Sequence, residues 1–535
     1  MAGSSSDQNY EFIVVGGGTS GCVVAGRLAQ AGRSVLLVEG GRDDNTSFIH
    51  MPGGFVRLFT SDRVMAYQTT PQKHAGSRTF FIPQANTLGG GSSVNAMIYI
   101  RGSAEDYNEW RELGCDGWGW DDVLPFFKKS ECNDTLSEPY HGTDGPIKVS
   151  NPWYGISTNL AFIKAGQEIG LPFNHDFNGQ RQEGIGFYQS TCFKGRRSSS
   201  AVGYLSPRRV HPKLTMRTNC KVLKLITEGM RVTGVVYRGR DGVRNEARAA
   251  REVILAAGAM ASPKILQLSG IGPSALLKDK GIEIVHDAPE VGENYQNHVE
   301  VPLHCRLKEP ISLFGQDKGF AALKHGLQYT LFRSGLLASS IAEAGAFIDT
   351  RKTGRPDVQL YLIPSLFGSP EWPAPPGHGV SICVQLLRPK SRGSVRLGSA
   401  APDDPVVFDA GALAHQDDVD TIVRGIEVAR RMIKAPSLAR IASGEIYSSP
   451  DGEEDARDPE GFVRKYTRSV SHVAGTCRMG SDARAVVDVQ LRVNGLSGLR
   501  VADASIIPKL VSGNTNAAAT LIGERCAEFV LRGLN

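Results

Sequence analysis

Residues 12–21 read Phe-Ile-Val-Val-Gly-Gly-Gly-Thr-Ser-Gly, and residues 34–39 read Ser-Val-Leu-Leu-Val-Glu. The apolar run before the glycines predicts a buried parallel strand, because strands buried on both faces are continuously hydrophobic. Gly16, Gly18 and Gly21 then allow a tight turn in which a pyrophosphate can approach the backbone without meeting a Cβ atom. This opening predicts a dinucleotide-binding βαβ unit.

The helix predicted over residues 19–31 strengthens that interpretation. Its first free N–H groups, at Thr19 and Ser20, point toward the pyrophosphate together with the positive end of the helix dipole. Glu39 closes the next apolar run about 20 residues on, where an acid accepts hydrogen bonds from ribose hydroxyls. An acid there disfavours a 2′-phosphate, so FAD or NAD is expected rather than NADP. An ordinary glycine-rich turn is the alternative, but it leaves Glu39 unexplained.

Length and composition bound the remaining possibilities. A chain of 535 residues exceeds what one compact core holds, so two or more domains are expected. The net charge of +5 is small for this length and no long run of like charges occurs, which argues against a nucleic-acid partner. No apolar stretch reaches the roughly 18 residues of a membrane-spanning helix, so no integral span is expected.

The cysteines indicate a reducing compartment. There are nine, scattered and without a C-x-x-C pair, which argues against a disulfide framework, a zinc site or an attached haem, and no metal site is expected. Most of them are expected to behave as small buried hydrophobes. The sequence therefore predicts a cytoplasmic location.

Two later segments have the same character as the opening. Residues 251–258 predict a buried strand that ends in glycine, followed by a helix through Leu268. Residues 499–503 predict a short strand that ends in Asp503, and residues 516–531 have apolar side chains at helical spacing. Strands this far apart imply one nucleotide domain assembled from discontinuous segments.

The segment from about 300 to 460 has a different pattern of apolar and polar residues. Strand-like runs at residues 358–363, 380–386 and 393–397 and a helical pattern at 417–433 predict an antiparallel sheet backed by helices. The predicted fold is therefore α/β, with a Rossmann-like dinucleotide-binding domain of discontinuous segments and an α+β substrate domain. The predicted boundaries are 1–150, 208–300 and 465–535 for the first domain and 151–207 and 301–464 for the second.

Four segments of the chain carry a further signal when they are taken together. They are residues 12–39, residues 87–102 (Thr-Leu-Gly-Gly-Gly-Ser-Ser-Val-Asn-Ala-Met-Ile-Tyr-Ile-Arg-Gly), residues 258–272, and the C-terminal pair 471–480 and 503–516. Together they resemble the glucose–methanol–choline (GMC) family of flavin oxidoreductases, and the resemblance covers nearly the entire chain. Within the family, the chain looks most similar to bacterial sorbose-type and aliphatic-alcohol dehydrogenases.

The resemblance implies FAD as the cofactor and assigns residues to it. Gly90, Asn95 and Met97, with Leu88, are placed near the flavin, and Val222 near the adenine. Asp503 is placed at the ribityl or pyrophosphate region, with a helix or turn cap as the alternative role. Asn516 opens the last helix, whose N-terminal N–H groups can face the electron-rich edge of the flavin.

Three positions depart from the family pattern. Some relatives carry a histidine at the position of Val94 that bonds covalently to the flavin, and valine has no nucleophilic atom. The FAD is therefore expected to be non-covalent. Asn86 stands where many relatives have a lysine or arginine, and Asn297 stands where relatives usually have aspartate, so each removes a charge.

The resemblance also identifies the expected catalytic pair. Oxidising an alcohol by hydride transfer to flavin N5 requires a group that removes the hydroxyl proton, and a neutral imidazole suits this role. His472 matches the family's catalytic histidine, and Asn514 matches a second active-site position that is histidine or asparagine in relatives. Since an amide cannot exchange a proton, His472 is expected to be the sole base.

The leading expectation is an FAD-dependent oxidation of a primary alcohol or sugar alcohol, with re-oxidation by a quinone, another acceptor or oxygen. The resemblance favours a dehydrogenase over an oxidase. An NAD-linked dehydrogenase, a flavin-containing lyase such as a hydroxynitrile lyase, and a non-enzymatic flavoprotein remain alternatives. Phe314, residues 331–337, Phe367 and Trp372 are candidates for the substrate pocket.

Overall fold

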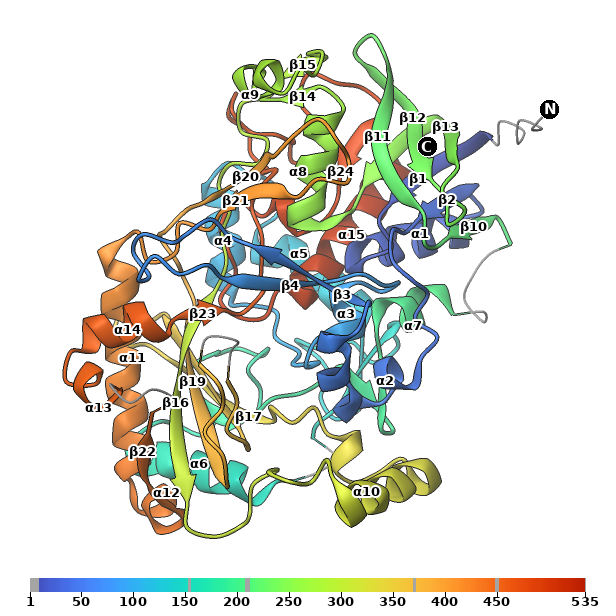
Figure 1. Ribbon diagram of the computed structural model, residues 1–535. Helices are drawn as coiled ribbons and strands as arrows, with labels where there is room; N and C mark the ends of the chain where they lie inside the picture. The colour runs from blue at the N-terminus through green and yellow to red at the C-terminus, as the bar shows by residue number, and fades with distance from the viewer. Residues whose placement is uncertain (1–8, 153–154, 207–211, 369–371, 448–451, 535) are drawn as a thin grey trace.

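Two seven-stranded sheets organise the protein (Figure 1). The computed structural model describes residues 9–152, 155–206, 212–368, 372–447 and 452–534. One sheet is mostly parallel and the other is antiparallel. The predicted combination of an α/β unit with an antiparallel sheet is therefore confirmed, while the proposed domain boundaries remain a prediction.

The first sheet draws its strands from three distant parts of the chain. Its strand order is β10-β2-β1-β13-β12-β11, with β24 beside β13. The parallel strands are β1 (Asn9–Val15), β2 (Val35–Val38), β10 (Leu214–Arg217), β13 (Arg244–Leu255) and β24 (Leu499–Val501). Antiparallel pairing joins β13 to β12 (Arg231–Arg238) and β12 to β11 (Lys221–Glu228).

Strand β13 explains how the sheet is assembled. It begins seven residues before the predicted Arg251, because its first half pairs with β12 while its second half pairs with β1 and β24. The helices that follow the parallel strands are α1 (Thr19–Gln30) after β1, α8 (Gly258–Leu268) after β13 and α15 (Asn516–Arg532) after β24. Helices α1 and α15 pack against each other. All three helices therefore begin at the carboxyl edge of the sheet.

The second sheet has the strand order β22-β16-β19-β18-β17-β7, with β23 beside β16. On one face, alternate residues are apolar, and they form one core with the buried stripe of helix α11 (Gln416–Lys434). The opposite face carries polar side chains such as Glu300, Gln359 and Gln385. The strands are β7 (Gly184–Phe187), β16 (Val299–Leu307), β17 (Ala344–Ile348), β18 (Val358–Ile363), β19 (Gly379–Leu386), β22 (Ala442–Ile446) and β23 (Arg468–Ser469).

One predicted strand lies outside this sheet. Residues 393–397 form β20 (Ser394–Leu397), which pairs with β21 (Val406–Asp409) in a separate hairpin that contacts α8. Another hairpin, β3 (Val64–Gln68) with β4 (Phe81–Ala85), crosses the molecule between the two sheets (Figure 1). Helix α10 (Gly319–Phe332) projects from the far end of the second-sheet region.

Further helices flank the two sheets. None of the helices in the described ranges, including these flanking ones, is both long enough and apolar enough to cross a membrane. The nine cysteines, which lie in strands, helices and loops, are all free thiols. The flanking helices are α4 (Ala104–Glu112), α5 (Trp120–Ser130), α6 (Ser157–Glu168), α7 (Ser200–Leu205), α12 (Pro436–Ile441) and α14 (Pro459–Tyr466).

Candidate active site

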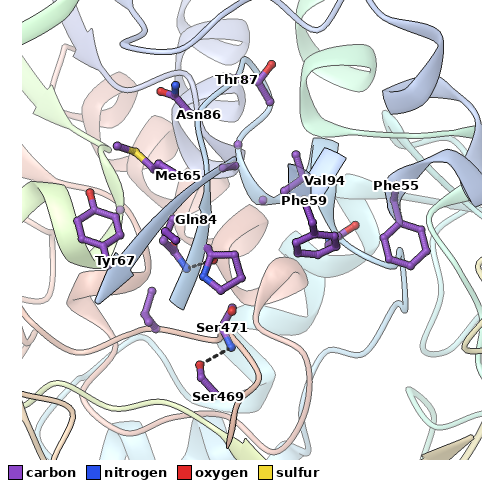
Figure 2. A pocket seen from close by; sticks show the side chains of 18 of the residues that line it. Phe55, Phe59, Met65, Tyr67, Gln84, Asn86, Thr87, Val94, Ser469 and Ser471 are labelled. Carbon is purple, nitrogen blue, oxygen red and sulfur yellow. Dashed lines mark hydrogen bonds between the residues drawn. The ribbon is translucent and has the colours of Figure 1, made fainter. Parts of the chain in front are cut away.

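A large cavity lies between the two sheets. Its volume is about 2560 Å³, and its walls include the glycine turn after β1, the β3–β4 hairpin and the polar face of the second sheet. A site for one small molecule has roughly 300–1,000 Å³, so this cavity has room for a dinucleotide and a second molecule. Figure 2 shows side chains of the hairpin, such as Met65 and Tyr67, around the same pocket as Ser469 and Ser471.

The first turn of α1 begins at the wall of this cavity. Gly18 is the N-cap, so no side chain caps the helix, and its first turn has no acidic residue. A Cβ atom on Gly21 would lie 1.9 Å from the Gly16 carbonyl oxygen, and one on Gly90 would lie 2.6 Å from Gly18 Cα. Glycine is therefore required for the close packing of the turn, which leaves the N–H groups at Gly18 and Thr19 facing the cavity.

Glu39 lies beside this turn. Its carboxylate accepts hydrogen bonds from the backbone N–H groups of Gly17 and Gly41, both at 2.7 Å. Burial raises the pKa of Glu39, and the two backbone hydrogen bonds oppose that shift. The side chain is thus fixed at the cavity wall, where each oxygen keeps a further lone pair for a hydroxyl donor.

Asp503 and Asn516 lie at two further helix starts. Asp503 accepts from the N–H of Gly258 at 2.9 Å and from the hydroxyl of Ser262 at 2.6 Å, both of which belong to α8. It also caps the short helix that follows it, through Ser505 N at 2.8 Å, so the alternative role as a cap is present as well. Asn516 donates to the Thr19 hydroxyl at 3.0 Å, which joins the starts of α15 and α1.

The loop after β4 forms another wall. Asn95 Oδ1 accepts from the Arg197 guanidinium at 2.8 Å and from Met97 N at 3.0 Å. Arg197 is buried, and burial lowers its pKa to about 9. Met97 adopts a left-handed backbone conformation with φ of 63°, which turns the chain at the cavity wall.

Most of the predicted cofactor residues line the cavity. Gly21 and Leu88 are not on its wall: Gly21 packs against Gly16, and Leu88 supports the turn from behind, with its Cδ1 2.7 Å from a Cβ built on Gly17. Among the predicted substrate-pocket candidates, Phe314 and Phe367 line the cavity, while Trp372 lies at a separate small pocket. The other residues that the sequence analysis singled out and that lie on the cavity wall are Gly16, Gly18, Thr19, Ser20, Glu39, Asn86, Gly90, Val94, Asn95, Met97, Val222, Leu336, Leu337, His472, Asp503, Asn514 and Asn516.

His472 and Asn514 meet at this wall, and a third residue orients them. His298 Nε2 lies 2.9 Å from the Leu387 carbonyl oxygen, so this nitrogen carries a proton. In neutral His298 the other nitrogen, Nδ1, must then accept the hydrogen bond that links it to His472 Nδ1 at 2.9 Å. His472 Nε2 is therefore unprotonated, and its lone pair accepts a hydrogen bond from Asn514 Nδ2 at 3.3 Å.

Electrostatics keep both rings neutral. Burial lowers the pKa of His298 to about 4. Burial, and then the neighbouring His298, lower the pKa of His472 well below its usual value. The cavity thus contains an unprotonated imidazole nitrogen that can accept a proton at neutral pH.

Asn297 holds the backbone of the catalytic candidate. Its Oδ1 accepts from His472 N at 2.8 Å, and its Nδ2 donates to the Ser469 hydroxyl at 2.7 Å. An aspartate at this position could accept but not donate, so the amide serves both neighbours. Sequence reasoning identified this position as a departure but missed the adjacent His298 as a partner of His472; the proximity of two histidines 174 residues apart has no local sequence signal.

The chain is similar to proteins of one family over almost its whole length. Models of the N- and C-terminal regions of GMC oxidoreductases match residues 10–300 and 389–523. The chain is 39% identical to an alcohol dehydrogenase [acceptor] of Pseudomonas putida, over 98% of this chain and 96% of that protein. It is 36% identical to an oxygen-dependent choline dehydrogenase of Brucella anthropi, over 97% and 95%. A formate oxidase of Aspergillus oryzae, solved in a study of FAD modification, has a TM-score of 0.92 and 27% identity over 99% of both chains.

Proposed function

The chain belongs to the GMC oxidoreductase family, whose cofactor is FAD, and from that premise we propose that it oxidises an alcohol to an aldehyde or ketone with His472 as the base. The observation that carries this proposal is the unprotonated Nε2 of His472, whose lone pair lies at the cavity wall beside Asn514.

The residues of the cavity fit FAD. Helices α1 and α15 both begin at the wall without a side-chain cap and without an acid in the first turn, and such helix starts suit anionic groups. Glu39 and Asp503 are acceptors for hydroxyl groups, and the contacts at Gly90 and Gly21 leave no space for a Cβ atom there. Val94 offers no atom for a covalent bond, so we propose non-covalent binding.

The chain's own residues account for the proton. When bound, FAD supplies the acceptor for the hydride that leaves the alcohol carbon with both electrons of its C–H bond. His472 Nε2 accepts the hydroxyl proton, and Asn514 orients the substrate oxygen through its amide N–H. The resulting imidazolium donates from Nδ1 to His298, which in turn donates to the Leu387 carbonyl. This chain of hydrogen bonds stabilises the charge that His472 gains.

Electrons must then leave the protein. Among the relatives described above, the alcohol dehydrogenase [acceptor] of Pseudomonas putida has the highest sequence identity, 39%, which supports a dehydrogenase re-oxidised by an acceptor such as a quinone. The oxygen-dependent relative from Brucella anthropi keeps oxygen as the other acceptor to test. The substrate is proposed as a primary alcohol or sugar alcohol.

Anaerobic mixing of the purified protein with primary alcohols, polyols and aryl alcohols tests the proposal, with bleaching of the flavin as the readout. His472→Ala is expected to slow flavin reduction roughly 100- to 10,000-fold while FAD stays bound. His175→Ala, a change at an exposed histidine outside the cavity wall, serves as the control and is expected to leave the rate unchanged. Unaltered reduction by His472→Ala would refute the assignment. Admitting oxygen or a quinone to the reduced enzyme then identifies the acceptor.

A further inference from the structure

An ion pair lies in the substrate half of the cavity, on the polar face of the second sheet. Arg468 donates from Nε and Nη2 to Glu300 Oε1 at 2.8 and 2.6 Å. Tyr361 donates its hydroxyl to Glu300 Oε2. The guanidinium carbon of Arg468 lies 3.8 Å from the centre of the Phe367 ring. These four residues, which we call the Arg468 cluster, all line the cavity.

Strand pairing places this cluster close to the proposed base. Glu300 pairs with Arg468 across β16 and β23, and it lies two residues after His298, the partner of His472. Two residues along a strand span about 6.6 Å, and side chains two apart point to the same face. The Arg468 cluster therefore faces the same cavity as His472, and a substrate in that cavity can contact both.

The two charges are not equally available to a substrate. The side chain of Glu300 is only 4% exposed, whereas that of Arg468 is 22% exposed. Both Glu300 oxygens already accept hydrogen bonds from the cluster. Arg468 Nη1 has no hydrogen-bond partner in the described part of the chain, and its two N–H groups are unused. The ion pair thus turns its positive end toward the cavity.

Neighbouring groups keep this arrangement charged and fixed. Burial lowers the pKa of Arg468, but the ion pair with Glu300 outweighs burial and raises it overall. Burial also raises the pKa of Tyr361 well above its usual value, so its hydroxyl stays protonated and continues to donate. Phe367 holds the guanidinium plane from the side.

We propose that Arg468 is a subsite for a carboxylate, so that the preferred substrates are alcohols with a carboxylate at the other end of the molecule. This inference rests on the proposed alcohol oxidation and specifies its substrate class. An anion about 4 Å from the guanidinium lies about 7 Å from the Glu300 carboxylate, and at an effective dielectric constant of about 20 the difference favours it roughly 20-fold. The same arrangement disfavours a quaternary ammonium group, because Glu300 is already neutralised.

The test compares three matched substrates on the FAD-loaded enzyme. They are 5-hydroxypentanoate, 1-pentanol and (4-hydroxybutyl)trimethylammonium, with kcat/KM from anaerobic flavin reduction. We expect the hydroxy acid to exceed the ammonium alcohol by at least about 20-fold. Arg468→Lys keeps a positive charge beside Glu300 but loses the N–H groups of the planar guanidinium that a carboxylate would contact. In this variant we expect the ratio of kcat/KM for 5-hydroxypentanoate to kcat/KM for 1-pentanol to fall about 10-fold.

Two further variants make the test specific. Glu300→Gln removes the opposing charge and keeps the shape, so the preference for the hydroxy acid is expected to rise. Arg430→Lys is the matched control: Arg430 also pairs with a glutamate, Glu445, and lies over a ring, Phe462, but it is not on the cavity wall. In Arg430→Lys the substrate ratios are expected to stay those of the unchanged protein.

The outcomes separate this subsite from the proposed function. A preference for the ammonium alcohol, or an unchanged ratio in a folded Arg468→Lys, would overturn the subsite while alcohol oxidation stands. If no alcohol reduces the flavin, the proposed function fails, and protection against thermal unfolding by pentanoate still tests the subsite. Pentanoate is then expected to protect the unchanged protein and Glu300→Gln more strongly than tetramethylammonium does, and equal protection would overturn the subsite.

Discussion

The geometry makes His298 the residue that selects the active tautomer of His472, and removing its acceptor nitrogen tests this directly. In His298→Leu the buried Nδ1–H of His472 loses its acceptor at 2.9 Å. A buried hydrogen bond of this kind is worth roughly 1–3 kcal/mol, which corresponds to about 5- to 150-fold in the balance between the two tautomers. The same hydrogen bond also stabilises the imidazolium that His472 becomes when it takes the hydroxyl proton, so flavin reduction is expected to slow by up to that factor.

His298→Asn provides the rescue. Its side-chain oxygen stands about where Nδ1 stood, so it can accept from His472, although the contact to Leu387 O at 2.9 Å is lost. We expect reduction at least about fivefold faster than in His298→Leu. Stopped-flow anaerobic reduction by one alcohol, with the FAD content of each variant measured separately, gives both rates. If the leucine and asparagine variants reduce the flavin at the same rate, the tautomer argument is refuted.

Two further predictions concern cofactor binding and pH. Glu39→Ala removes the acceptor of two 2.7 Å hydrogen bonds and is expected to weaken FAD binding about 10- to 150-fold, measured by titrating the apoprotein with FAD; an unchanged Kd would contradict the role assigned to this acid. Burial is the main cause that lowers the pKa of His304 to about 4 in the folded protein, whereas the pKa of an unperturbed histidine is about 6.5. Between these two pH values the unfolded chain binds a proton at His304 and the folded chain does not. Folding stability is therefore lost as the pH falls from about 6.5 toward 4. Between pH 7 and pH 5 this loss in the free energy of unfolding amounts to about 2 kcal/mol. The drop in Tm between these pH values is therefore expected to be about 2 °C smaller in His304→Asn than in the unchanged protein. An equal drop in both proteins would count against the buried neutral ring.

Much of the nucleotide-binding part could be predicted from the sequence because its signals are local. The strand, glycine turn, helix and acid of residues 12–39 are contiguous, and each has its own chemical reason. The antiparallel sheet was also predictable in outline from its alternating strands. The hairpin of β20 and β21 was not, because its strand pattern is the same as that of a strand inside the second sheet, and only contacts with α8 decide its place.

The site was harder to predict than the fold. His472 and Asn514 were identified through a family resemblance, and the structure brings them within 3.3 Å, but their catalytic roles remain proposals. His298 and Arg468 were missed. Each is an isolated polar residue near a strand, and such residues are usually exposed or structural. Their significance comes from partners 174 and 168 residues away along the chain, which no periodicity reveals.

The position of His472 follows from the path of the chain between the sheets. Strand β23 ends at Ser469 in the second sheet, and β24 begins at Leu499 in the first, so residues 470–498 must connect the two. His472 lies three residues after β23, where the two residues that precede β16 hold it, Asn297 at its backbone and His298 at its ring. After β24 the chain continues through Asp503 to the start of α15, and both lie where the first sheet borders the cavity. The proposed base is therefore held by the substrate-side sheet and faces the cavity that both sheets enclose, because the chain crosses there from one sheet to the other.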